Sequence, residues 1–211
     1  MSDGKPQDKD HYILARDKAL SGLQDRFEPS RIERLGASVA DDQSVELPCL
    51  AWRFRFAFDP YSAVVLPSED ELSVKWQILS LEYLAAPVPS APGEFVSFAQ
   101  FPETRTYKPT FDGRVLGRLS HGIGATREKF VESAENCNGA MAEEDNPCTY
   151  LFKVFPRFEL QVTHHKADEE FPAACNVLFP DNALEILSPE SIVVVAEILT
   201  ASLEGKTPAA S

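Results

Sequence analysis

The sequence LAWRFRFAF, residues 50–58, decides the fold class because its large apolar side chains fall on every second position. Arg53 and Arg55 occupy positions between them. A period of two is typical of a β-strand that has one face on a hydrophobic core. Residues 59–62, DPYS, have turn chemistry, and residues 63–66 are apolar, so we predict a hairpin here.

The same alternation recurs in the second half of the chain. Phe158, Leu160 and Val162 alternate with polar residues, which predicts a second strand with one buried face. Strands are also predicted over 95–98 and 176–179, and helical spacing predicts helices over 11–27, 29–36, 110–119, 126–136 and 189–205. The mixture predicts an α+β fold, with helices packed on a largely antiparallel sheet.

Residues 68–71, SEDE, have the pattern of a capping box at the start of a helix. In such a box the side chain of Ser68 accepts a backbone N–H bond, and the side chain of Glu71 reaches back. The apolar residues that follow at helical spacing are Leu72, Trp76, Leu79 and Tyr83. Pro87 ends the predicted helix, because proline cannot continue the hydrogen-bond ladder.

The chain is predicted to form a single α+β domain over residues 11–205. Residues 1–10 and 206–211 are polar or small, and we expect them to be disordered tails. The loop 87–93, rich in proline, is the best candidate for an internal boundary.

Charge excludes some classes of partner. The chain has 211 residues and a formal net charge of −13, and its lysines and arginines are scattered. Nucleic acids and anionic membrane surfaces would be repelled, so we expect neither as a partner. Residues 1–10 contain no apolar stretch, and the apolar run 192–196 is too short to cross a bilayer, so we expect a cytoplasmic protein. A protein partner is possible, and the oligomeric state is not predicted.

The four cysteines argue against a metal cofactor. None of Cys49, Cys137, Cys148 and Cys175 forms a C-x-x-C pair, which zinc and iron–sulfur sites usually contain. No cofactor is therefore evident. Cys137 and Cys148 flank a polar loop and could meet in space, but two reduced thiols is the favoured interpretation for a protein of the cytosol.

The most polar patch is HHKADEEFP, residues 164–172. Its candidate ligand or metal-binding residues are His164, His165, Asp168, Glu169 and Glu170. Imidazole nitrogen and carboxylate oxygen suit a borderline or hard metal ion. Successive strand residues point to opposite faces, however, so the two histidines cannot easily share a ligand. A charged hairpin connection that is solvated is the favoured alternative.

A second patch combines Arg105 and Tyr107 with the later His121. These residues are candidates for anion binding, because residues 124–126 lead into a predicted helix whose N-terminal N–H groups favour negative charge. A plain connection between helices is the alternative, since the turn lacks a phosphate-binding motif. No serine or cysteine has the neighbours of a known nucleophile.

Several strings along the chain are characteristic as a group: WQILSLEYL (76–84), FVSF (95–98), Tyr107, Phe111, FP (155–156), DEEFPA (168–173), VLF (177–179) and NA (182–183). Together they resemble the uncharacterised domain-of-unknown-function family 3786, from about residue 11 to residue 203. That family occurs mostly in anaerobic bacteria and archaea, and some relatives carry an added ferredoxin-like cysteine motif. This sequence lacks the motif, so the resemblance implies no iron–sulfur cluster here.

Two hypotheses for function follow. The first is a non-catalytic binding or accessory domain associated with anaerobic redox or one-carbon metabolism. It predicts an exposed apolar patch or groove. The alternative is a small-molecule or metal-dependent enzyme that uses the acidic turn from His164 to Glu170. It predicts a deep pocket in which those side chains converge.

Overall fold

A computed structural model describes residues 6–41 and 44–210, and it divides the chain into two compact units. The first comprises Met1–Pro48, Trp52–Val88 and Pro208–Ser211, and the second comprises Cys49–Ala51 and Pro89–Thr207. The main division, between Val88 and Pro89, falls inside the loop 87–93 that the sequence marks as a candidate boundary. The expectation of a single domain over 11–205 stays a prediction.

The first unit contains an antiparallel sheet whose strands follow chain order. Its hairpin confirms the alternation in residues 50–58: Phe54 pairs with Val65, Phe56 pairs with Ala63, and all four side chains are buried. The sheet begins earlier than the sequence indicated, because residues 38–49 supply two further strands. The strands in order are β1 (Ser38–Asp41), β2 (Ser44–Cys49), β3 (Trp52–Phe58), β4 (Tyr61–Leu66) and β5 (Asp70–Glu71).

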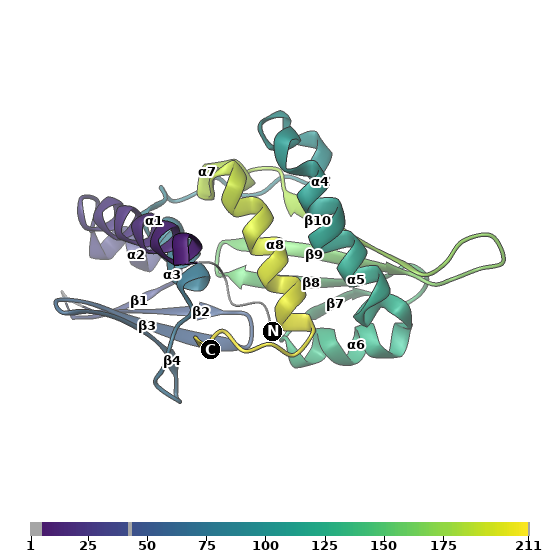
Figure 1. Ribbon diagram of the computed structural model, residues 1–211, viewed down its shortest axis with the longest axis horizontal. Coiled ribbons are helices and arrows are strands. Elements are labelled where there is room, and N and C mark those ends of the chain that lie inside the picture. The colour runs from purple at the N-terminus through teal and green to yellow at the C-terminus, as the bar shows by residue number, and fades with distance from the viewer. Residues whose placement is uncertain (1–5, 42–43, 211) are drawn as a thin grey trace. The chain divides into compact units, whose positions relative to one another are not determined.

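Three helices complete the first unit: α1 (Pro6–Gln24), α2 (Pro29–Arg34) and α3 (Val74–Ala85). They lie on one face of the sheet, with α1 against α3 (Figure 1). The guanidinium of Arg31 donates hydrogen bonds to the carbonyls of Leu84 and Ala86, so a side chain of α2 satisfies the C-terminal end of α3.

The capping box predicted at residues 68–71 is wrong. Asp70 and Glu71 form β5 and pair with Val65 and Val64, so the sheet satisfies their backbone groups. The helix starts later, at Val74. Its predicted buried side chains at Trp76, Leu79 and Tyr83 are confirmed.

Both predicted tails need correction. Helix α1 begins at Pro6, and Met1–Lys5 lie outside the described residues. At the other end, Pro208 accepts a hydrogen bond from Ser73 N, and Ala210 N donates to Glu71 O. Residues 208–210 are therefore held by the free edge of β5, where unpaired backbone groups are available.

The second unit contains another antiparallel sheet. The strands predicted over 95–98, 158–163 and 176–179 are confirmed, with longer bounds for the last two. The other two strands, β7 and β8, were not predicted, because β7 is exposed throughout and β8 is buried with little alternation. The order across the sheet is β6 (Phe95–Ser97), β10 (Ala174–Pro180), β9 (Phe158–His165), β8 (Cys148–Phe155) and β7 (Ala140–Glu143). The two sheets confirm the α+β fold.

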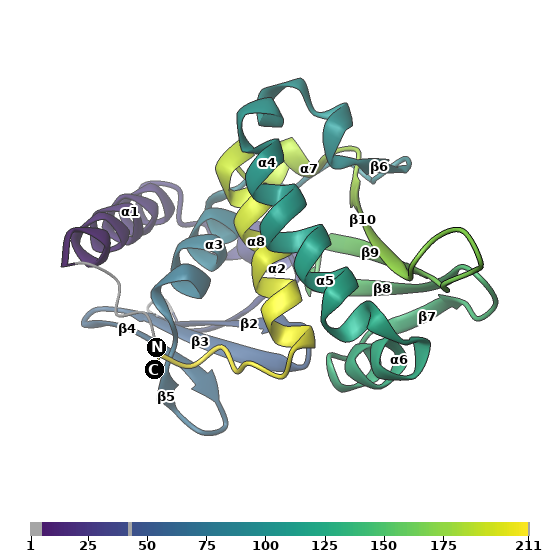
Figure 2. The same ribbon diagram turned by 45° about the vertical axis from the view of Figure 1, so that its right-hand side comes forward.

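Helices cover one face of this second sheet, where α8 runs beside a helical run from Lys108 to His121 (Figures 1 and 2). That run comprises α4 (Lys108–Phe111), a π-helical turn (Asp112–Gly117) and α5 (Arg118–His121), and it ends at Gly122 as predicted. Short 3-10 turns occur at Phe98–Gln100, Pro102–Tyr107 and Ile123–Ala125, and the other helices are α6 (Arg127–Asn136), α7 (Ala183–Ile186) and α8 (Pro189–Leu203).

The caps of the longer helices in the second unit follow the sequence. Thr126 accepts a hydrogen bond from Lys129 N at the start of α6, and Ser188 accepts one from Ser191 N at the start of α8. None of the helices in residues 6–41 and 44–210 is long and apolar enough to cross a membrane.

Candidate functional site

The polar stretch 164–172 begins at the end of β9, where alternation separates its two histidines. His164 points into the unit and is 1% exposed, whereas His165 is exposed on the other face. The Nε2–H group of His164 donates to the carbonyl oxygen of Gly124 at 3.0 Å. Its ring stacks on Phe130, with the centroids 5.4 Å apart. His164 is therefore fixed between β9, α6 and the turn before α6.

Burial lowers the pKa of His164 below its ordinary value of 6.5, although the bond to Gly124 opposes the shift. The ring is consequently neutral at physiological pH, with its hydrogen on Nε2. In that tautomer Nδ1 is a hydrogen-bond acceptor.

A row of side chains crosses the sheet at His164. Cys148 on β8 and Cys175 on β10 are its directly opposed neighbours, so the order is Cys148, His164, Cys175. Gly124 packs over this row, because a Cβ atom there would lie 2.3 Å from the Sγ of Cys175. Glycine is required for this close approach.

The thiols of Cys137 and Cys175 in this unit are poor nucleophiles at neutral pH. All four cysteines of the chain lie in the described residues, where they are buried and form no disulfide bond. Burial raises the pKa of Cys175 to about 12 and that of Cys137 to about 11. Thiols with such values are protonated at neutral pH and are poor nucleophiles.

Beyond His165 the chain leaves the sheet and forms the hairpin tip, which we define as residues 166–173 (Figures 1 and 2). Asp168 organises it: its Oδ1 accepts hydrogen bonds from Glu170 N at 2.9 Å and from Phe171 N at 2.7 Å. Asp168 N donates to Phe171 O at 2.9 Å. The bond from Phe171 N, followed by that from Glu170 N, lowers the pKa of Asp168.

The hairpin tip exposes its side chains to solvent. Phe171 is 66% exposed, and Asp168, Glu169 and Glu170 are exposed as well. The five candidate ligands at 164–170 are therefore not brought together. No three His, Cys, Asp or Glu side chains within the described ranges 6–41 and 44–210 are placed to hold a metal ion.

A pocket of about 330 Å³ lies at the base of the hairpin tip. Its floor contains the buried His164 and Cys148, and its rim is polar. We call it the basal pocket, and its lining residues are Arg127, Glu144, Asp145, Asn146, Cys148, His164 and Lys166. These residues come from α6, the β7–β8 connection, β8, β9 and the start of the hairpin tip.

Two hydrogen bonds hold the β7–β8 connection in this pocket. Arg127 donates from Nη2 to the carbonyl oxygen of Glu144, and Lys166 donates from its backbone N to Asn146 Oδ1 at 3.1 Å. Behind the floor, Tyr150 is buried, and its hydroxyl has no hydrogen-bond partner among the described residues. Burial raises the pKa of this phenol, and the charge of Glu135 adds to the shift.

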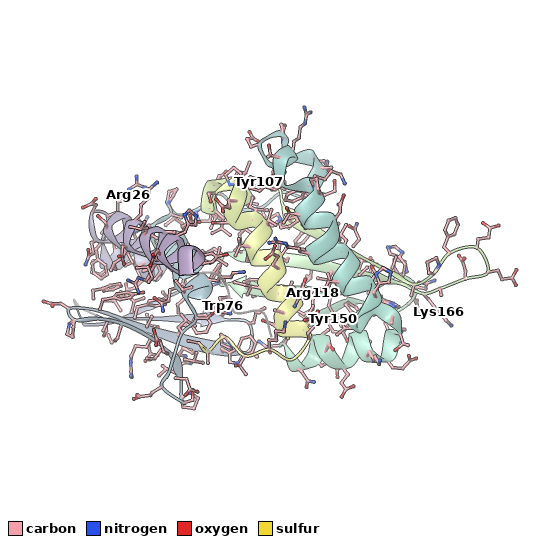
Figure 3. The ribbon with its side chains drawn as sticks, viewed as in Figure 1. Arg26, Trp76, Tyr107, Arg118, Tyr150 and Lys166 are labelled. Carbon is pink, nitrogen blue, oxygen red and sulfur yellow. The ribbon has the colours of Figure 1, made fainter. Side chains whose placement is uncertain are left out.

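The three residues predicted to bind an anion, Arg105, Tyr107 and His121, lie in two different elements, and no described contact joins them. Arg105 and Tyr107 lie in the 3-10 helix Pro102–Tyr107, and Figure 3 shows Tyr107 far from Lys166. His121 donates from Nδ1 to Gly117 O at 2.7 Å, within its own helical run. The helix start that motivated this prediction nevertheless borders the basal pocket through Arg127, the first residue of α6.

Sequence reasoning missed the basal pocket as a unit. In the sequence, Glu144, Asp145 and Asn146 have the pattern of an acidic loop. Arg127 has the pattern of an ordinary surface residue of a helix. Lys166 and His164 lie in the polar stretch, but nothing local links them to residues 127 or 144–146. Pairing of β8 with β9 brings residues 144–146 close to residues 164–166, and the bond from Arg127 to Glu144 O adds α6.

Comparison with known proteins gives a family but no activity. Residues 29–202 match the family DUF3786, described as a domain of unknown function, which confirms the resemblance seen in the sequence. No curated protein and no solved structure matches the chain.

Proposed function

The chain belongs to the DUF3786 family, a domain of unknown function, and we propose that it is a non-catalytic accessory domain that docks onto a protein partner through its hairpin tip. The exposure of Phe171 carries this proposal. A large aromatic side chain that is 66% exposed gains free energy when a partner covers it. Aromatic residues of this kind are common anchors of protein interfaces.

Preorganisation supports the same function. Asp168 accepts two backbone hydrogen bonds within the hairpin tip and donates a third, so the turn that presents Phe171 is already shaped. A shaped loop loses less conformational entropy on binding than a mobile one. Asp168 therefore stabilises the loop, and Phe171 provides the surface that a partner would contact.

The charge of the hairpin tip indicates the chemistry of the partner. Asp168, Glu169 and Glu170 precede Phe171, and no described residue forms an ion pair with Glu169 or Glu170. A partner with an apolar hollow and a rim of lysine or arginine would match both features. Such complementarity mainly accelerates association and makes it sensitive to salt.

The setting of this domain is part of the proposal. We place it in the cytoplasm, because four buried cysteines without a disulfide bond among the described residues suit a reducing compartment. Its association with anaerobic redox or one-carbon enzymes rests on the resemblance alone, because some relatives carry an added ferredoxin-like cysteine motif.

No observation favours the enzymatic alternative. A metal-dependent or small-molecule enzyme built on the acidic turn needs Asp168, Glu170 and a histidine around one point. Asp168 and Glu170 are exposed in the hairpin tip, whereas His164 is buried and bonded to Gly124.

Photo-crosslinking tests the docking function. A photoreactive phenylalanine analogue is placed at position 171 or, as a matched control, at position 14, because Leu14 is 68% exposed and lies on α1. Each protein is irradiated in a lysate of the native host, and the adducts are identified by mass spectrometry. We expect one dominant protein adduct at position 171 that is absent at position 14.

The same adduct must respond to the hairpin tip. An excess of unlabelled wild-type protein should abolish it, an excess of the Phe171→Ser protein should not, and added salt should reduce it. Equal labelling from positions 14 and 171, or equal competition by the two proteins, would contradict docking through Phe171.

A further inference from the structure

We propose that the basal pocket binds a small zwitterion, a molecule that carries one carboxylate and one ammonium group in the manner of an α-amino acid. Arg127 and Lys166 would hold the carboxylate, and Glu144 and Asp145 would hold the ammonium group. This site is separate from the docking function of Phe171, which does not line the pocket.

The first support is that charges of both signs line one cavity without pairing. Arg127 has a described bond only to a backbone carbonyl, and within the described residues the Nζ of Lys166 and the carboxylates of Glu144 and Asp145 have no ion-pair partner. Each charge is thus available to a ligand. A guanidinium group suits a carboxylate in particular, because it donates in a planar fork.

The balance of these charges selects the class of ligand. Two cationic and two anionic side chains line the pocket, although the whole chain carries −13. A simple anion would gain from Arg127 and Lys166 but would be repelled by Glu144 and Asp145. A simple amine would be attracted by Glu144 and Asp145 but repelled by Arg127 and Lys166. Only a ligand with both charges is attracted by side chains of both signs.

The rim is held in place before any ligand arrives. The bond from Arg127 to Glu144 O ties the β7–β8 connection to α6, and the bond from Lys166 N to Asn146 ties it to the hairpin. Cationic and anionic groups are therefore anchored on different segments. A preorganised rim of this kind lowers the entropic cost of binding.

The floor adds the imidazole of His164 beside the thiol of Cys148. His164 presents an acceptor at Nδ1, since its Nε2–H is used by Gly124. A cavity of about 330 Å³ is at the small end of ligand pockets, which suits a molecule of amino-acid size.

Amide NMR of the full chain tests the site. The natural α-amino acids are added one at a time, and acetate, inorganic phosphate and methylamine serve as probes with a single charge. We expect at least one amino acid to shift the amides of Arg127, Asn146 and Lys166 saturably in the millimolar range or below. The single-charge probes should bind at least about tenfold more weakly.

Variants separate this site from its surroundings. Lys166→Gln and Glu144→Gln should each weaken binding of the selected amino acid by at least about fivefold, because each removes one charge contact. Lys129→Gln is the matched control on α6: this exposed lysine does not line the pocket, so affinity should be unchanged. Phe171→Ser should also bind normally, which keeps this test independent of docking.

The outcome is decisive in either direction. Saturable shifts at the pocket, lost in Lys166→Gln and Glu144→Gln proteins whose remaining spectra are unchanged, establish the site. The proposal is overturned if no amino acid gives saturable shifts. It is equally overturned if acetate or phosphate binds as tightly as the best amino acid, or if Lys129→Gln weakens binding as much as Lys166→Gln.

Discussion

His164 and Phe171 belong to one short polar string, yet they occupy opposite environments. His164 is 1% exposed, stacked on Phe130 and bonded to Gly124. Phe171 is 66% exposed, and its backbone N–H donates a hydrogen bond to Asp168 Oδ1. In this string the histidine forms part of the floor and the aromatic residue forms part of the surface, which reverses the usual preference of the two residue types.

The difference teaches that neighbours in sequence need not form one site. The string crosses from a paired strand into a free loop between His165 and Lys166. Side chains before that point are set by the sheet, and those after it are set by local hydrogen bonds to Asp168. Four changes can break or sharpen this contrast.

The largest expected effect is at Phe130, which supports the buried end. Phe130→Ala removes a fully buried ring that contacts His164 and Tyr150, so we expect a loss of about 3–5 kcal/mol in the free energy of unfolding. Phe171→Ala should change it by no more than about 0.5 kcal/mol. Urea denaturation measures the free energy of unfolding of both variants. Similar losses in the two would contradict the contrast between the buried and exposed ends of the string.

Gly124 tests the close packing above the histidine. In Gly124→Ala the new Cβ atom would lie 2.3 Å from Cys175 Sγ and 2.8 Å from Leu119 O, so we expect a loss of about 1–3 kcal/mol. Gly113→Ala is the control, because nothing lies within 4 Å of its added Cβ, and it should be neutral or stabilising by up to about 1 kcal/mol. Thermal and urea unfolding that treat the two variants alike would refute the packing argument.

The buried imidazole should make stability depend on pH. The pKa of His164 is lower in the folded state than its ordinary value of 6.5, so the unfolded chain binds the proton more readily. Stability contributed by the neutral ring is complete above that value and is lost as pH falls below it toward the folded pKa.

His164→Gln keeps an N–H donor for Gly124 O but cannot titrate. We expect its unfolding free energy to fall less than that of the wild type between about pH 8 and pH 5. His165→Gln keeps the buried ring, so it should retain a pH dependence that His164→Gln lacks. Urea denaturation at several pH values checks this, and equal slopes for His164→Gln and the wild type would exclude the buried histidine as the cause.

The smallest effect is expected in the hairpin tip. Asp168→Ala removes the acceptor of two backbone N–H groups, so hydrogen exchange at the amides of Glu170 and Phe171 should accelerate while global stability is unchanged. Glu169→Ala, which removes no described hydrogen bond, should leave both exchange rates unaltered. Unchanged exchange in Asp168→Ala would show that the turn is held by other contacts.

Much of the fold could be predicted locally. Alternation located β3 and β9, and caps at Thr126 and Ser188 located α6 and α8. The capping box at residues 68–71 failed because sheet pairing satisfied the same backbone groups. β7 and β8 escaped prediction because β7 is exposed throughout, and β8 has apolar residues at six of its eight positions, which hides the period of two.

The candidate site was predicted only in part. Alternation alone requires that His164 and His165 face opposite ways. It does not say which face is covered, and that is decided by the packing of Gly124 and Phe130 against β9. The string 164–172 therefore marks an important region without distinguishing its buried end from its exposed end.

The sequence by itself determined the acidity of this chain, the alternating strands, most helix boundaries and the family. Those properties depend on composition or on neighbours within a few residues. Only the tertiary structure decided that Arg127, Asn146 and His164 border one pocket and that Phe171 stands apart from it. The physical reason is that strand pairing joins residues far apart along the chain, and no local pattern encodes which of them will meet.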